Sequence, residues 1–200
     1  PNPSFNMSER SIKSFVEYAS VPVVSLESAT RHPLQSLADC VTIAEERLRP
    51  RPKVVLTWAP HPRKLPQAVA NSFAEWMRAW GEVDLVIANP AGMDLAPEFT
   101  RDIQVFNSQE EAFAGADFVY AKNWSSYFDY GATLNAPDWQ ITAEKMDLTN
   151  NGKFMHCLPV RRNVVVADSV LNSEQSLVLK QANNRTWAAA AVLNTILVNT

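Results

Sequence analysis

A short run near the carboxyl end of the chain gathers reactive and anion-binding side chains. It occupies residues 154–162 and reads Phe-Met-His-Cys-Leu-Pro-Val-Arg-Arg. Because proline cannot donate a ladder hydrogen bond, a strand that ends near His156 must turn there. The guanidinium groups of Arg161 and Arg162 suit a carboxylate or a phosphate. The run predicts an anion-binding turn at a sheet edge, although composition alone favours a buried His156–Cys157 pair followed by a solvated basic turn.

A second cluster, Arg-His-Pro-Leu-Gln, occupies residues 31–35 and has the pattern of a helix start. The first backbone N–H groups of a helix are unpaired, and the helix dipole favours anions there. His32 could donate to a carbonyl oxygen that gains charge, and Gln35 could both donate to and accept from an amide-like substrate. Taken alone, the cluster is better explained as an ordinary helix cap.

Together, the two clusters resemble the signatures of the transcarbamylases, which carbamoylate amines of the ornithine type. The strings are His-Pro-x-Gln at residues 32–35 and His-Cys-Leu-Pro at residues 156–159, in the expected order and a domain's length apart. The extension Val-Arg-Arg-Asn at residues 160–163 is more similar to the branch that acts on N-acylated ornithine. The resemblance covers essentially the whole chain but only about the last two-thirds of a family member.

The resemblance implies a direct reaction, in which an uncharged δ-amine attacks carbamoyl phosphate without an acyl-enzyme. Cys157 then need not be a nucleophile, and the backbone of residues 157–158 accepts hydrogen bonds from the carbamoyl NH2 and the amine. Arg161 would assist carbonyl or phosphate binding. The implied catalytic residues are His32, Gln35, Cys157 and Arg161. The implied substrate-binding residues are Glu27, His32, Pro33, Leu34, Gln35, His61, Lys122, Cys157, Leu158, Arg161 and Arg185.

Lys122 carries the argument about the substrate amine. It stands where ordinary ornithine carbamoyltransferases have an aspartate-containing motif ending in Ser-Met-Gly, whose aspartate meets the free α-amino group. A lysine repels an α-ammonium group but suits a carboxylate or an amide oxygen, so we expect the α-amine to be acylated. The alternative is a solvated surface lysine.

Three other candidates also have structural explanations. Glu27 could pair with a substrate amine or with Arg31. His61 could recognise an acyl or carboxylate group, or simply pack in its proline-rich loop. Arg185 could contact substrate, or cap the last helix and form an interdomain salt bridge.

The predicted function is carbamoyl transfer from carbamoyl phosphate to the δ-amine of an N-acylornithine, giving N-acylcitrulline for arginine biosynthesis. The sequence Ala-Pro-His-Pro-Arg at residues 59–63 and the leucine at position 34 resemble those of N-succinylornithine enzymes more than those of N-acetylornithine enzymes. The family implies a homotrimer with shared active sites, whose domains close to exclude water. The alternatives are N-acetylornithine, ornithine or putrescine as the amine, or a non-catalytic amino-acid-binding module.

Composition excludes several classes of protein. The net charge of −3 argues against a nucleic-acid partner, and no stretch approaches the roughly 20 apolar residues of a membrane span. Cys40 and Cys157 match no metal spacing and fit a reduced cytoplasmic setting. No Gly-x-Gly-x-x-Gly turn occurs, so we expect no nucleotide cofactor. We also expect no metal site.

Apolar runs that alternate with helical patterns predict an α/β fold, a doubly wound parallel sheet with helices on both faces, preceded by the tail of a first α/β domain. Helices are expected from Ser11 and at 34–48, 67–80, 110–114 and 184–197. Strands are expected at 21–26, 53–58, 83–88, 103–106, 117–121, 154–156 and 177–179. Several charged groups and all three histidines, His32, His61 and His156, then fall at strand ends on one sheet edge, where ligands bind in such folds.

These elements predict four segments. Residues 1–31 are expected to be the tail of a carbamoyl phosphate domain, because one strand without partners cannot form a domain. Residues 32–49 are an interdomain helix, 52–183 an N-acylornithine-binding domain, and 184–200 a helix that packs back on the first domain. The family's phosphate-binding motif Ser-x-Arg-Thr is absent from all 200 residues, so we expect the chain to be a C-terminal piece that is inactive alone.

Overall fold

A five-stranded parallel sheet forms the centre of the molecule. The computed structural model describes residues 3–129, 132 and 134–198, and the strand order is β3-β2-β1-β4-β5. The chain thus builds outward from β1 to β3 and then returns to add β4 and β5 on the other side of β1. The strands are β1 (Lys53–Trp58), β2 (Asp84–Ala88), β3 (Gln104–Phe106), β4 (Phe118–Lys122) and β5 (Lys153–Met155). The predicted α/β class and doubly wound parallel sheet are confirmed.

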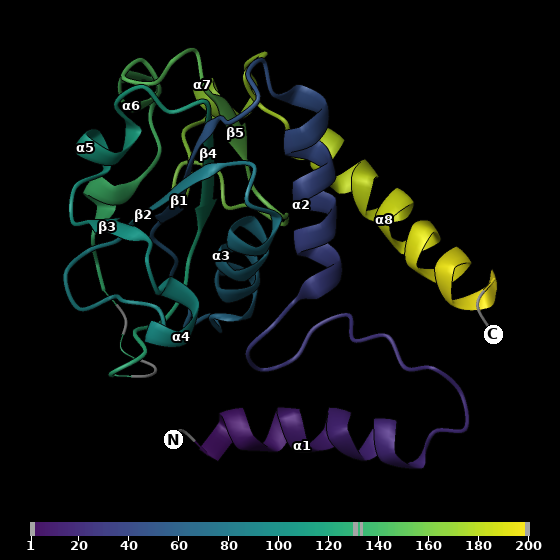
Figure 1. Ribbon diagram of the computed structural model, residues 1–200. Helices are drawn as coiled ribbons and strands as arrows, with labels where there is room; N and C mark the ends of the chain where they lie inside the picture. Colours follow the sequence, from purple (N-terminus) through teal and green to yellow (C-terminus); the bar gives the residue numbers. More distant parts are fainter. Residues whose placement is uncertain (1–2, 130–131, 133, 199–200) are drawn as a thin grey trace.

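Helices cover both faces of this sheet (Figure 1). Those on one face are α2 (Pro33–Glu46), α3 (Ala68–Trp80) and α8 (Val178–Val198). Those on the other are α5 (Gln109–Phe113), α6 (Ala143–Met146) and α7 (Asp168–Leu171). Two further short elements are α4 (Pro97–Thr100), which contacts α3, and the 3-10 helix η1 (Pro137–Trp139).

Local residue choice explains where the main helices start and stop. Pro33 occupies the first turn of α2, where its missing N–H costs nothing. Helix α3 ends at Gly81, whose φ of 72° places it in the left-handed region that glycine tolerates. Between them, β1 is buried from Val54 to Trp58 because helices cover it on both sides.

The core joins the sheet to α3 and to the loop after β4. Phe73 of α3 packs edge-to-face on Tyr120 of β4, with ring centroids 4.5 Å apart. The indole of Trp58 donates a 2.9 Å hydrogen bond to the carbonyl of Trp124. The end of β1 and the segment after β4 are therefore held together at the sheet edge predicted to bind ligand.

Two predicted strands are wrong. Residues 21–26 form an irregular exposed segment, because no strand among the described residues offers them a hydrogen-bonding partner. Residues 177–179 open α8, which begins at Val178 instead of at residue 184; only an isolated bridge between Phe154 and Ser176 precedes it. Three apolar residues in a row do not distinguish a strand from a helix start.

The amino-terminal helix also differs from expectation. Helix α1 spans Pro3–Tyr18 and begins well before Ser11. It stands apart from the sheet (Figure 1). The carboxylate of Glu9 accepts a 2.8 Å hydrogen bond from Thr30, which joins α1 to the segment that leads into α2. The outer ends of the two predicted terminal segments, residues 1–2 and 199–200, lie outside the described residues.

Candidate functional site

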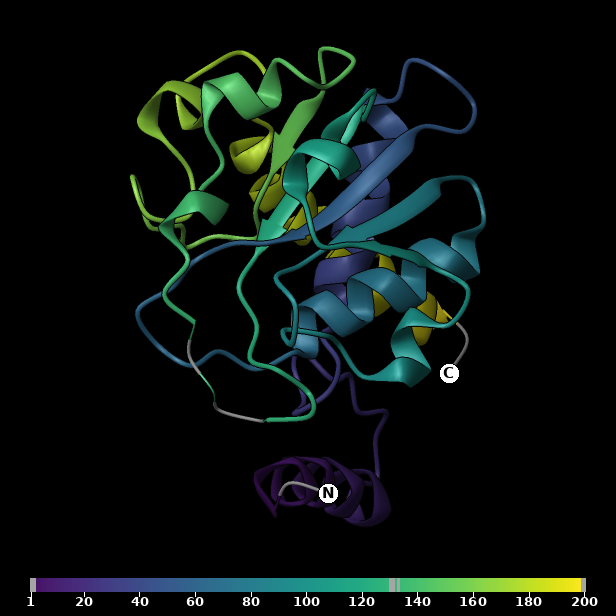
Figure 2. The same ribbon diagram turned by 90° about the vertical axis from the view of Figure 1, so that its left-hand side faces the viewer.

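The carboxyl ends of β1, β4 and β5 form one edge, at the point where the strand order reverses. Trp58 and Lys122, the last residues of β1 and β4, are register partners. The connections that follow these strands run on the same side of the sheet, at the lower left of Figure 2, and Ser125 donates a 3.0 Å hydrogen bond to Leu65 across them. Ligands of doubly wound folds bind at such a switch point.

His61 and Arg161, 100 residues apart in the chain, meet at this edge. Arg161 Nε donates to His61 Nε2 at 3.1 Å, while His61 Nδ1 lies 3.1 Å from the carbonyl oxygen of Arg63. A guanidinium group only donates, so Nε2 accepts, and the backbone N–H of Arg63 also lies 3.1 Å from Nδ1. Burial lowers the pKa of His61, and the charges of Arg161 and Lys122 lower it further. His61 is therefore neutral and pairs with the arginine predicted to be catalytic.

The adjacent arginine has a structural role instead. Arg162 Nη1 lies 2.6 Å from Asp168 Oδ1 and 3.1 Å from the side-chain oxygen of Asn172. These contacts fix the loop after β5 to α7, and Asn163 adds two hydrogen bonds to Asp168. The expectation that both adjacent arginines suit an anion is wrong for Arg162, whose charge is already neutralised.

Lys122 is half-buried at the end of β4, among the other candidates. Its positive charge lowers the pKa values of His32, His61, His156 and Cys157, although burial has the largest effect on each. No salt bridge in the described part of the chain includes Lys122. A partly desolvated ammonium group without a counter-ion favours an anionic ligand, so the surface-lysine alternative does not fit its position.

The Cys157–Leu158 segment leaves its carbonyl groups available. Burial raises the pKa of the Cys157 thiol, which is therefore protonated near neutral pH and a weak nucleophile. No hydrogen bond between described residues uses the carbonyl oxygen of Cys157 or Leu158. The Leu158–Pro159 peptide is cis and Leu158 has a φ of 47°, so the turn departs from strand geometry here. These features fit the predicted use of the backbone as an acceptor.

His32 sits at the start of α2 as a buried, neutral imidazole. Its backbone N–H donates to Ser72 Oγ at 2.7 Å, while its ring atom Nδ1 has no partner among the described residues. Burial lowers the pKa of His32; the carboxylate of Glu27 opposes this and the charge of Arg185 adds to it. The charges of Glu27 and Arg185 thus both act on the His32 ring.

The structure also decides between alternatives for these neighbours. Arg31 pairs with Glu75 through two hydrogen bonds of 2.9 and 3.0 Å, so the Glu27–Arg31 pair is wrong. Arg185 lies inside α8, so it does not cap that helix. Both observations leave Glu27 and Arg185 as candidate substrate contacts.

Gln35 is buried one turn after His32. Its Nε2 donates a 2.7 Å hydrogen bond to Asp39, one turn further along α2, and its Oε1 has no partner among the described residues. Sequence reasoning singled out Gln35 but missed Asp39. The signal was present in the i, i+4 spacing of the two residues on one helix.

A groove brings together candidates from three parts of the chain. Leu34 at the start of α2, the 157–159 turn and Arg185 of α8 line it. Pro33 is half-buried beside Leu34. His61 lines another hollow with Pro60, Pro62, Leu134, Asn135 and Val164. The groove therefore brings together Leu34, Cys157, Leu158 and Arg185, whereas His61 lines a separate hollow.

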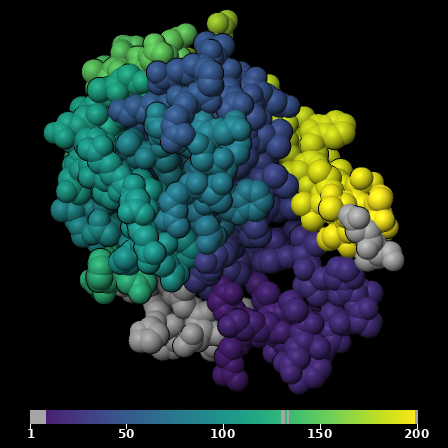
Figure 3. Space-filling model, viewed as in Figure 1, coloured from purple at the N-terminus to yellow at the C-terminus, as the bar shows by residue number. Residues whose placement is uncertain are grey.

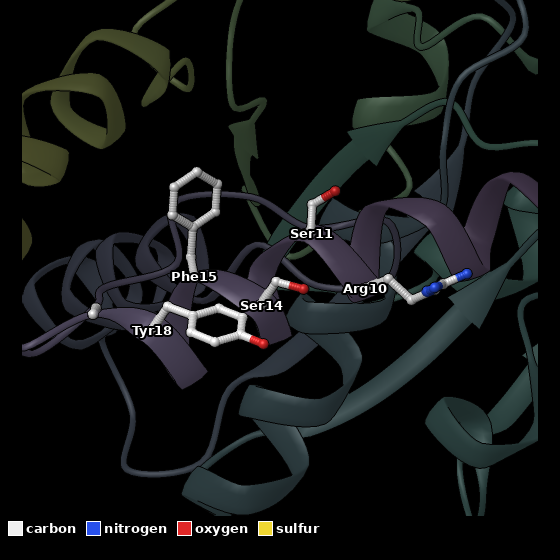
Figure 4. Close-up of a pocket in the computed structure, with 6 residues that line it drawn as sticks. Arg10, Ser11, Ser14, Phe15 and Tyr18 are labelled. Atoms are coloured by element: carbon white, nitrogen blue, oxygen red, sulfur yellow. The ribbon is translucent and has the colours of Figure 1, made fainter.

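Another hollow lies along α1, the helix that stands apart from the sheet (Figure 4). Its lining residues are Arg10, Ser11, Ser14, Phe15, Tyr18 and Ala19, all from this helix and its carboxyl end. None of them belongs to the predicted site. One face of a single helix does not enclose a ligand, so we do not assign this hollow to the reaction.

Comparison with known families identifies this constellation. The family model described as "Aspartate/ornithine carbamoyltransferase, Asp/Orn binding domain" matches residues 66–196. The chain belongs to the aspartate/ornithine carbamoyltransferase family. The match covers the sheet from the loop after β1 onward and includes His-Cys-Leu-Pro. His-Pro-x-Gln lies before it.

Several relatives of this chain are named as carbamoyltransferases of acylated ornithine. The chain is 51% identical to the N-succinylornithine carbamoyltransferase of Bacteroides thetaiotaomicron over 196 residues, covering 96% of this chain and 61% of that protein. It is 34% identical to the N-acetylornithine carbamoyltransferase of Xanthomonas axonopodis, covering 91% and 59%. A crystal structure of acetylornithine transcarbamylase complexed with acetylcitrulline superposes with a TM-score of 0.85 at 31% identity, covering 96% and 64%. The chain thus spans about three-fifths of these relatives.

Two further observations concern only the described residues. None of the helices there is long and apolar enough to cross a membrane. No group of three or more histidine, cysteine or acidic side chains in the same part of the chain could hold a metal ion.

His156 should make the stability of this chain sensitive to acid. Burial lowers the pKa of His156 to about 3, and its Nδ1 accepts a 3.1 Å hydrogen bond from the Leu158 N–H. The unfolded chain binds the proton near pH 6.5, so stability from the neutral ring is complete above that pH and declines as the pH falls towards 3. We expect a loss of about 2 kcal/mol between pH 7 and pH 5 from this group.

Denaturant unfolding of the wild type and of His156→Asn at both pH values measures this loss. The asparagine oxygen can replace Nδ1 as the acceptor but does not titrate, so the variant should lose about 2 kcal/mol less than the wild type between the two pH values. Equal losses in both proteins would show that His156 is not the source.

Proposed function

We propose that the complete protein transfers the carbamoyl group of carbamoyl phosphate to the δ-amine of N-succinylornithine, giving N-succinylcitrulline and phosphate for arginine biosynthesis. The observation that carries this proposal is Lys122, a half-buried ammonium group without an anionic partner among the described residues, close to His61 and Cys157. It suits an acyl carboxylate or amide oxygen and opposes a free α-ammonium group. The 51% identity to a protein named N-succinylornithine carbamoyltransferase supports the same substrate.

In the proposed reaction, the δ-nitrogen forms a bond to the carbamoyl carbon while the bond from that carbon to a phosphate oxygen breaks. The amine loses one proton, which the leaving phosphate takes up. The neutral ring of His32 donates to the carbonyl oxygen as it gains charge. Gln35 and the carbonyl groups of Cys157 and Leu158 accept hydrogen bonds from the NH2 group and the amine, and no covalent enzyme intermediate forms.

The remaining candidates orient the two substrates. Arg161, oriented by His61, binds the carbamoyl oxygen or the phosphate, since most of its guanidinium N–H groups are not used within the described residues. Glu27 and Arg185, whose charges act on His32, contact the amine and the anionic part of the substrates respectively. Pro33 and Leu34 shape the wall of the groove.

We further propose the domain organisation that the family implies. Residues 1–31 belong to a carbamoyl phosphate domain, 32–49 form the interdomain helix, 52–183 bind the N-acylornithine, and 184–200 pack back on the first domain. Figure 3 shows α8 projecting from the body, and its outer residues Leu193 and Leu197 are exposed. A cytoplasmic homotrimer with shared active sites completes the proposal.

The decisive experiment assays the complete protein with carbamoyl phosphate and three amines in parallel: N-succinylornithine, N-acetylornithine and ornithine. We expect product from N-succinylornithine, and at least about 100-fold lower kcat/KM with ornithine, because an unscreened like charge beside Lys122 costs several kcal/mol. If the protein prefers N-acetylornithine, the proposed acyl group is wrong, but the protein is still an N-acylornithine carbamoyltransferase. Turnover of ornithine alone would contradict the role of Lys122, and no turnover with any amine would favour a non-catalytic binding module.

A further inference from the structure

A fully buried carboxylate lies behind Gln35. Asp39 Oδ1 accepts hydrogen bonds from Gln35 Nε2 at 2.7 Å and from Gln181 Nε2 at 2.6 Å. Gln35 and Asp39 belong to α2, whereas Gln181 belongs to α8 and lies 142 residues from Asp39. Asp39 and Gln181 have no solvent exposure, and Gln35 has 1%. A buried carboxylate is costly, so its retention needs a reason beyond ordinary helix packing.

The hydrogen bonds fix the direction of every amide in this cluster. The backbone N–H of His156 can only donate, and it does so to Gln181 Oε1 at 2.9 Å. Gln181 therefore turns its NH2 group to Asp39, which accepts it. Because Asp39 Oδ1 is an acceptor, Gln35 must also turn its NH2 group inward.

This orientation affects the other polar atom of the Gln35 carboxamide, its oxygen. Its Oε1 is buried and has no hydrogen-bond partner among the described residues. A buried carbonyl oxygen without a donor loses the free energy of a hydrogen bond unless a ligand supplies one. Gln35 stands three residues after His32 and directly after Leu34, which lines the groove.

We propose that Asp39 is a positioning residue: with Gln181 it locks the Gln35 carboxamide so that Oε1 is offered as an acceptor to the NH2 group of the carbamoyl substrate. This inference rests on the proposed function and deepens it. The lock also ties α2 and α8 to the backbone of His156, the residue before Cys157. It thereby couples the two signature segments, His-Pro-x-Gln and His-Cys-Leu-Pro.

The lock depends on an acceptor at position 39 and not on a charge. Burial raises the pKa of Asp39 to about 7, against the opposing hydrogen bonds from Gln181, Gln35 and Tyr120. A proton on Oδ2 would leave Oδ1 free to accept both amide bonds. Asparagine at this position retains an acceptor oxygen, whereas leucine has about the same volume and no acceptor.

The test compares Asp39→Leu, Asp39→Asn and the control Thr42→Val in the complete protein. Thr42 lies one turn further along α2 and accepts a 3.0 Å hydrogen bond from Asn184 of α8, so the control removes another buried α2–α8 bond without touching Gln35. We expect Asp39→Leu to lower kcat/KM for carbamoyl phosphate about 30-fold, the equivalent of about 2 kcal/mol for a buried amide left unoriented. The KM of the amine should stay within about twofold in all three variants, since only the carbamoyl contact depends on Gln35.

The conservative variant gives the sharpest outcome. Asp39→Asn should keep kcat/KM within about threefold of the wild type, and Thr42→Val within about twofold. A folded Asp39→Leu protein with unchanged kinetics, or an Asp39→Asn protein as impaired as Asp39→Leu, would overturn the proposal. If Asp39→Leu does not fold, Gln181→Met tests the same lock: it should raise the KM for carbamoyl phosphate, and an unchanged KM would refute the lock. A wild-type protein without carbamoyl transfer would instead refute the proposed function.

Discussion

Replacing Lys122 with aspartate is expected to lower kcat/KM for N-succinylornithine more than about 1000-fold. Two effects add in this variant. The substrate loses a charge-assisted hydrogen bond in a half-buried site, and it meets a like charge where it needs an opposite one. The measurement is steady-state kinetics of the complete protein with carbamoyl phosphate held at saturation.

Two further variants separate charge from structure. Lys122→Met keeps most of the side-chain volume and removes only the charge, so a smaller loss of about 100-fold is expected. Lys153→Asp makes the same change in charge on the neighbouring strand β5, at its amino end, where Lys153 pairs in register with Phe118. That end of the sheet lies opposite the site, so Lys153→Asp should retain nearly full activity.

The same variants can contradict the proposal. If Lys122→Asp uses N-succinylornithine as well as the wild type does, Lys122 does not contact the substrate. If instead Lys153→Asp is equally inactive, the loss reflects the charge or stability of the domain. Gain of ornithine turnover by Lys122→Asp would be the strongest support, since the aspartate would then meet a free α-ammonium group.

The strands that the sequence predicts correctly are those that have a neighbouring strand in the sheet. Lys53–Trp58 is a continuous apolar run at the centre of the sheet, and its predicted ends agree with the structure. Residues 21–26 have a similar composition but no neighbouring strand among the described residues, so the same pattern produces an exposed coil. An apolar composition indicates that a segment favours burial. Whether its backbone forms a strand depends on a neighbouring strand that can accept and donate hydrogen bonds.

The short helices were beyond sequence reasoning for a different reason. Helices α4, α6 and α7 contain four residues each, which is too short for a helical period to appear. Helix α8 starts earlier than expected because Leu177 and Val178 are buried by tertiary contacts. Such contacts override local preference at an element boundary.

The candidate site shows the same division between local and distant information. Placing His61, Lys122 and Cys157 at one edge required only strand ends and a parallel sheet. The expectation that His32 also follows a strand is wrong, because residues 21–26 form no strand and His32 lies at the start of α2. Arg161 and Arg162 are equivalent in sequence, and only the position of Asp168 decides which of them is used structurally. The bond between Asp39 and Gln181 joins residues 142 positions apart, so it could not be predicted without the fold.

His32→Ala should lower kcat about 100- to 1000-fold, the usual effect of removing one donor to a developing oxyanion. The fold should tolerate the change. The imidazole makes no capping hydrogen bond, and the bond from residue 32 to Ser72 uses the backbone N–H, which alanine retains. The KM values of both substrates should change little, because the donor acts most strongly when charge develops in the transition state.

The control for His32 is its neighbour Arg31. Arg31 pairs with Glu75 and stacks on Phe99, with its guanidinium carbon 4.9 Å from the ring centroid, so its contacts lie away from the strand ends. Arg31→Ala should therefore reduce the stability of the α2 start by up to about 1 kcal/mol while kcat remains near that of the wild type. A His32→Ala protein with wild-type kcat, or an Arg31→Ala protein with the same loss of kcat, would remove His32 from the catalytic set. In the second case the packing at the start of α2, and not the imidazole, would limit the rate.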